Sequence, residues 1–79
     1  MDKDKVHDII EATLRGGNST PRLLDLPKII SIRSKIQSCS SINDVLVIIE
    51  KHRILISKAF GLSDDVIDKT MEKLKALEI

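Results

Sequence analysis

The stretch from Val45 to Phe60 limits how this chain folds more than any other, because it is apolar on nearly every side of a helix. Seven of its side chains fall on one broad face at about 100° per residue: Val45, Ile48, Ile49, Leu55, Ile56, Ala59 and Phe60. Val47 and Ile54, seven residues apart, lie on the opposite side. A small domain has enough neighbours to cover one face of a helix but rarely both. We therefore expect one continuous helix that packs on its own fold with one side and on a partner with the other.

The spacing of apolar residues and the helix end signals predict four helices and no strand. The helices are expected over about residues 3–14, 27–38, 41–60 and 63–77. The apolar side of the last one is predicted to contain Val66, Ile67, Thr70, Leu74 and Leu77. Short connections between the last three favour antiparallel neighbours. The predicted fold class is a small all-α bundle of about four helices in a single domain, 1–79, with a helical core over 27–79 and an N-terminal helix, 1–17, that could form a separate arm.

Residues typical of helix ends mark most of these boundaries. Gly16 and Gly17 are expected to end the first helix as residues free to adopt positive φ. Ser41 and Ser63 are expected to cap the third and fourth helices. Gly61 has the position of a C′ glycine that closes the third helix, with the next residue folding back.

Composition excludes several kinds of binding site. Phe60 is the only aromatic residue, so base-stacking platforms and aromatic cages are not expected. The net charge is only +1, which does not favour strong attraction to nucleic acid or anionic membranes. The basic residues are nevertheless concentrated in 15–35, where nucleic-acid binding is the alternative function, through Arg22, Lys28, Arg33 and Lys35.

No combination of residues predicts catalysis, a metal site or a cofactor. Cys39 is the single cysteine, which fits a reducing cytoplasm. It falls at the C-terminal end of a predicted helix, where the helix dipole raises the pKa of a thiol, and nothing supplies an orienting third group. His7 with its acidic neighbours is an ordinary charged helix face. We expect a cytoplasmic protein that is not an enzyme, with no signal peptide and no membrane-spanning segment.

His52 falls within the apolar face of the third predicted helix. One interpretation is a pH-sensitive core or interface residue, because burial lowers the pKa of an imidazole. The other is a neutral core histidine whose ring nitrogens find hydrogen-bond partners. The second is the more common role of a histidine on an apolar helix face.

Val47 and Ile54 are the predicted contact for self-association or for a protein partner. Their heptad spacing on a helix already apolar on its other face is typical of a seam between helices. Lys51, Arg53 and Lys58 are expected to form the charged rim of this contact. The alternative is that the N-terminal helix covers both residues and the protein is a monomer.

The segment Cys39-Ser40-Ser41-Ile42-Asn43-Asp44-Val45, followed by Ile48-Ile49-Glu50-Lys51-His52-Arg53, resembles the central helix of the Hha/YmoA family. Those small helical proteins modulate gene expression by binding the nucleoid protein H-NS. The chain departs from the family in lacking its aromatic residues and its tryptophan-bearing end. A second similarity is to the AriR-type biofilm and acid-response regulators, which are helical dimers. Either resemblance implies a helical regulator, most simply a homodimer or a modulator of a larger protein.

Overall fold

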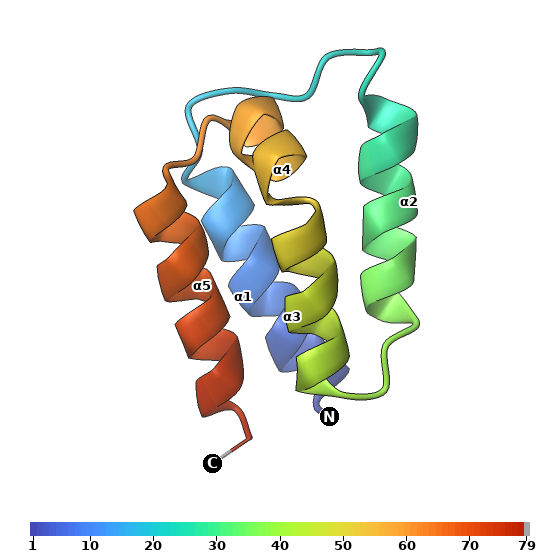
Figure 1. The fold of residues 1–79 in the computed structure, drawn as a ribbon, viewed down its shortest axis with the longest axis vertical. Helices are drawn as coiled ribbons and strands as arrows, with labels where there is room; N and C mark the ends of the chain where they lie inside the picture. The colour runs from blue at the N-terminus through green and yellow to red at the C-terminus, as the bar shows by residue number, and fades with distance from the viewer. Residues whose placement is uncertain (79) are drawn as a thin grey trace.

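Helices are the only regular secondary structure in residues 1–78, the part of the chain that this computed structural model describes (Figure 1). They are α1 (Lys3–Arg15), α2 (Leu26–Gln37), α3 (Ile42–Lys51), α4 (Arg53–Phe60) and α5 (Asp64–Ala76). The all-α prediction is confirmed. The prediction of one long helix over 41–60 is wrong, because this stretch forms two helices, α3 and α4, which makes five helices in residues 1–78.

The chain bends between α3 and α4 at His52. Its backbone has φ −109° and ψ 16°, outside the helical region. The N–H of His52 still donates to the carbonyl of Ile48 at 3.1 Å, and its carbonyl accepts from Ile56 at 3.0 Å. No glycine or proline marks the bend, so the apolar pattern alone could not reveal it.

The bend lets the end of α4 pack on the loop that follows α1. The N–H of Ser19 donates to the carbonyl of Phe60 at 3.2 Å. Gly17 approaches this carbonyl so closely that a Cβ there would lie 1.9 Å from the oxygen. Gly16 has φ −76°, and among residues 1–78 only Gly61 has a positive φ. The expected positive φ at Gly16 and Gly17 is therefore wrong, and Gly17 is needed for close contact instead.

The other predicted helix ends are confirmed. Ser41 and Ser63 each accept a hydrogen bond at the side-chain oxygen from the N–H three residues later, at 3.2 and 3.3 Å. Gly61 is left-handed, with φ 65° and ψ 45°, and the N–H of Leu62 donates to the carbonyl of Ser57 at 3.0 Å. This is the Schellman arrangement that the sequence indicated.

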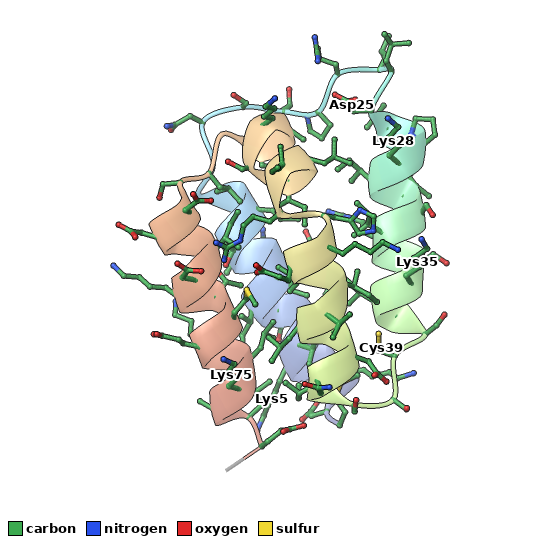
Figure 2. The ribbon with its side chains drawn as sticks, viewed as in Figure 1. Lys5, Asp25, Lys28, Lys35, Cys39 and Lys75 are labelled. Carbon is green, nitrogen blue, oxygen red and sulfur yellow. The ribbon has the colours of Figure 1, made fainter. Side chains whose placement is uncertain are left out.

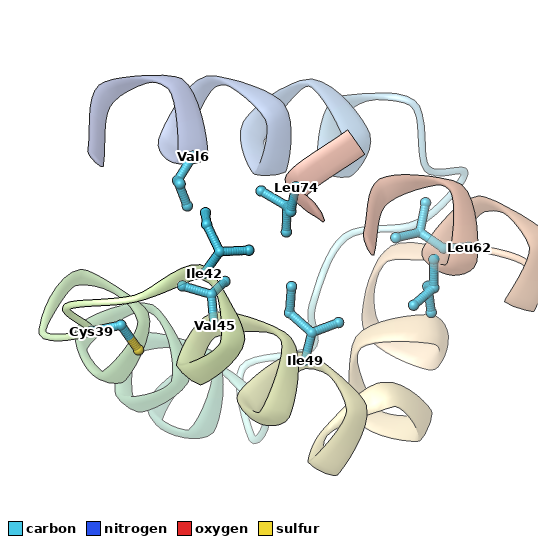
Figure 3. Packing of buried hydrophobic residues seen from close by; sticks show 8 residues of the cluster. Val6, Cys39, Ile42, Val45, Ile49, Leu62 and Leu74 are labelled. Carbon is cyan, nitrogen blue, oxygen red and sulfur yellow. The ribbon is translucent and has the colours of Figure 1, made fainter. Parts of the chain in front are cut away.

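The core forms where α1, α3 and α5 meet, with α4 and the segment before α2 closing one end (Figures 1 and 3). Val6 of α1, Val45 of α3 and Leu74 of α5 are almost completely buried. α1 packs mainly against α5 and contributes Val6 to the buried cluster. Val66 is exposed, although it was expected on the apolar side of the last helix.

α2 lies at the edge of the fold and packs chiefly against α3 (Figure 1). Two polar contacts tie it to α1. Arg33 forms an ion pair with Glu11 at 2.9 Å, and the Nζ of Lys3 donates to the carbonyl of Gln37 at 3.1 Å. No helix in the described part of the chain is long and apolar enough to cross a membrane.

Candidate interaction surfaces

Val47 and Ile54 both point away from the core. Their exposed fractions are 58% and 72%, and α1 does not cover them. Because the bend at His52 separates them, Val47 belongs to α3 and Ile54 to α4. The two residues are therefore not members of one heptad seam, although each is available for contact.

The predicted rim divides into two parts. Lys51 and Lys58 are exposed, and their role as a rim stays a prediction. Arg53 instead contacts acidic side chains of its own fold: Glu50 at 3.4 Å, Asp64 at 3.9 Å and Asp68. Arg53 is therefore an internal link.

The Arg53 link fastens α4 to α5. Its guanidinium also reaches the Sδ of Met71 on α5 at 3.7 Å, while its buried Nε lacks a well-aligned hydrogen-bond partner among residues 1–78. The hydrogen bond with Asp68 raises the pKa of Arg53 above its usual value. One cation shared by several acids holds the beginning of α5 against the bend.

A second apolar surface surrounds the start of α2. Leu23 and Leu24, in the turn before the helix, have exposed fractions of 84% and 87%. Leu26 and Ile30 on the first turns of α2 are also exposed. We call these four residues the leucine surface. Sequence reasoning missed it, although three leucines at positions 23, 24 and 26, directly before Pro27, were a visible signal.

The basic residues of 15–35 do not gather on one face. Arg22 pairs with Asp25 at 3.6 Å, and Arg33 pairs with Glu11 at 2.9 Å. Lys28 and Lys35 lie on α2 two turns apart, on the side that faces α4 and the bend (Figure 2). Of the four residues named for nucleic-acid binding, the two arginines are thus paired with different carboxylates, and the two lysines line a groove.

A groove of about 330 Å³ runs between α2 and the start of α4. α2 supplies one wall, with Lys28, Ile32 and Lys35 among its residues, and His52 and Leu55 form the other. Pro27 and Ser31 complete the lining. Among residues 1–78, no carboxylate lines this groove.

His52 is half-buried beside this groove and is not deep in the core. Burial lowers the pKa of its imidazole, and the positive charges of Lys35 and Lys51 lower it further. The pKa of His52 is therefore lowered, as predicted from burial. The sequence pattern did not predict the second cause, which is the positive charge of Lys35 and Lys51.

Cys39 has the environment of a structural residue. Its side chain is buried, and the Sγ donates to the carbonyl of Lys35 at 3.2 Å. Burial raises the pKa of the thiol, and the negative charge of Asp44 adds to this effect. A protonated, buried thiol is a poor nucleophile.

A smaller, apolar cavity of about 50 Å³ lies between α1, α2 and the core. The hydroxyl groups that border it, on Thr13 and Thr70, are hydrogen-bonded to each other at 2.7 Å. Cavities that bind small molecules in proteins generally measure about 300 to 1,000 Å³. This space is a void in the core.

Within residues 1–78, no group of three or more His, Cys, Asp or Glu side chains lies close enough to hold a metal ion. No protein-family model matches the chain, and neither curated proteins nor solved structures show significant similarity to it. The resemblances to the Hha/YmoA and AriR families therefore stay predictions from the sequence, and function has to be argued from the surfaces.

Proposed function

We propose that this protein is a non-catalytic protein–protein interaction module that assembles through exposed aliphatic side chains, as a homodimer or on a partner. The observation that carries the proposal is the nearly complete exposure of Leu23 and Leu24, next to Leu26 and Ile30. Burying one leucine is worth about 1.5 to 3 kcal/mol, so covering two adjacent ones would supply a substantial part of a binding free energy. Contiguous exposed apolar surface on a small protein is typical of interaction sites.

Val47 and Ile54 provide further apolar contact on α3 and α4, with Lys51 and Lys58 beside them. A role in modulating gene expression is proposed from the resemblance of 39–53 to the Hha/YmoA family alone. The nucleic-acid alternative is less favoured, because Arg22 and Arg33 are already paired with carboxylates and a phosphate would have to displace these.

Sedimentation velocity over a wide concentration range tests the proposal. We expect the wild-type chain to reach the mass of a dimer, and the double variant Leu23→Ser/Leu24→Ser to remain a monomer. The double variant Val47→Lys/Ile54→Lys measures how much Val47 and Ile54 contribute to dimer formation. Val66→Ser is the matched control, since Val66 is exposed on α5 and belongs to neither surface. A wild-type monomer at every concentration would contradict self-association.

A further inference from the structure

The groove between α2 and α4 has a regular arrangement of charge and apolar surface. Lys28, Ile32 and Lys35 lie on one face of α2 because they are four and three residues apart. The two lysines are separated by seven residues, which is about 10.5 Å along a helix axis. The groove thus has a cation at each end of one wall and an aliphatic side chain between them.

Each wall of the groove includes an aliphatic side chain. Ile32 is buried, and Leu55 on the opposite wall is half-buried. The groove volume of about 330 Å³ lies within the range of pockets that bind ligands. An aliphatic side chain entering here would therefore be covered from both walls.

The cations around the groove lack partners within the described part of the chain. Lys28, Lys35 and Lys51 form no ion pair among residues 1–78, whereas Arg22 and Arg33 each do. The acidic groups near the bend do not compensate them, since Glu50, Asp64 and Asp68 all contact Arg53. The groove therefore has uncompensated positive charge along one wall.

We propose that this groove is the docking site for an acidic amphipathic helix of a partner protein. Two carboxylates of that helix, seven residues apart, pair with Lys28 and Lys35, and an aliphatic side chain between them contacts Ile32 and Leu55. The proposal deepens the proposed function, on which it rests, by naming the chemistry of the partner. A nucleic-acid strand fits less well, because it would place phosphates against the apolar side chains of Ile32 and Leu55, and among residues 1–78 no Phe, Tyr or Trp lines the groove for base stacking.

A second copy of this chain does not supply such a helix. Two pairs of acids stand seven residues apart on its helices, Asp4 with Glu11 on α1 and Asp65 with Glu72 on α5. The positions between them on the same face are charged or polar in both cases, and Glu11 is already paired with Arg33. The occupant is therefore a different protein.

The proposal can be tested by NMR with a defined peptide probe. The probe is an end-capped peptide of about 15 residues, with two glutamates seven positions apart, leucines midway between them, and alanine and glutamine elsewhere. We expect it to bind saturably and to raise the pKa of His52, because bound carboxylates offset the charges of Lys35 and Lys51. The imidazole of His7, on α1 and outside the groove, provides the internal reference.

Matched variants distinguish peptide binding at the groove from general electrostatic attraction between the peptide and the protein. Lys28→Gln/Lys35→Gln is expected to weaken binding by about tenfold, the loss of roughly 1.4 kcal/mol. Lys69→Gln/Lys73→Gln removes the same charge from α5, outside the groove, and is expected to leave the affinity within about twofold. A twin peptide with both glutamates replaced by glutamine is expected not to bind.

Three results would overturn the proposal. The first is no binding of the acidic peptide, and the second is equal weakening by the α5 variant. The third is tighter binding of an oligothymidylate of about 15 nucleotides to the same groove. If the peptide fails while sedimentation still shows the dimer, only the docking site is rejected. If both fail, the proposed function is rejected as well.

Discussion

Thr13 and Thr70 stand 57 positions apart in the chain, and their hydroxyl oxygens lie 2.7 Å apart, which links α1 to α5. Each hydroxyl also lies near a backbone carbonyl, that of Ile9 at 3.1 Å and that of Val66 at 2.8 Å. Two hydroxyl protons cannot make three hydrogen bonds at once. The shorter distance favours Thr70 donating to the carbonyl of Val66 while Thr13 donates to Thr70.

Thr13→Val therefore removes a donor at the contact between α1 and α5 while keeping the shape of the side chain. We expect it to lower the free energy of unfolding by about 1 kcal/mol in urea titrations. Thr20→Val, at an exposed threonine in the loop, is the control and is expected to change stability by less than about 0.5 kcal/mol. Equal effects of the two substitutions would show that the hydrogen bond between Thr13 and Thr70 does not contribute to the free energy of unfolding.

Gly17 and Gly16 offer a matched pair for the contact between α4 and the loop. A Cβ at Gly17 would lie 1.9 Å from the carbonyl oxygen of Phe60, so this backbone must shift in Gly17→Ala. At Gly16 the nearest atom would be 3.5 Å away, which is an ordinary contact. We expect Gly17→Ala to cost about 2 kcal/mol or more, measured as a lower midpoint of thermal unfolding, and Gly16→Ala to be neutral or slightly stabilising.

The ion pairs of Arg53 are expected to matter more than an exposed pair elsewhere. Arg53→Gln leaves Asp64, Asp68 and Glu50 near one another without their shared cation. Arg22→Gln breaks one pair of a largely exposed arginine. Urea unfolding at low salt should show a larger loss for Arg53→Gln, and added salt should narrow the difference. An equal loss in the two variants would contradict the role of Arg53 in holding α5.

The lowered pKa of His52 predicts a pH dependence of stability. Burial and the charges of Lys35 and Lys51 disfavour the imidazolium in the folded protein, so the unfolded chain binds the proton more readily. Stability should therefore be full above the unfolded pKa of about 6.5 and fall as the pH drops through the lower folded value.

Urea unfolding at several pH values between about 5 and 7.5 measures how the free energy of unfolding depends on pH. His52→Gln should flatten this dependence on pH. A slope that persists in His52→Gln would assign the dependence to other groups.

The sequence predicted the parts of the fold that depend on local chemistry. Ser41, Ser63 and Gly61 mark helix ends because capping involves residues only a few positions apart. The bend at His52 was missed, since a bent and a straight helix have the same apolar spacing. The bend accompanies contacts distant in sequence, such as that of Phe60 with the loop after α1, which the local pattern does not contain.

The candidate surfaces were predictable only in part. The exposure of Val47 and Ile54 follows from helical spacing, but the ion pairs of Arg53 depend on where α5 packs. The groove that Lys28 shares with Leu55 arises from the bend and from the edge position of α2. Neither the ion pairs of Arg53 nor the groove can be predicted from a short stretch of the sequence.

Thermal unfolding as a function of protein concentration tests most directly whether the exposed aliphatic side chains are covered by assembly. A dimer gains stability by mass action, so the midpoint should rise steadily with concentration in the wild-type chain and stay constant in Leu23→Ser/Leu24→Ser. A wild-type midpoint that does not change with concentration would contradict self-association and leave Leu23 and Leu24 as exposed residues of a monomer.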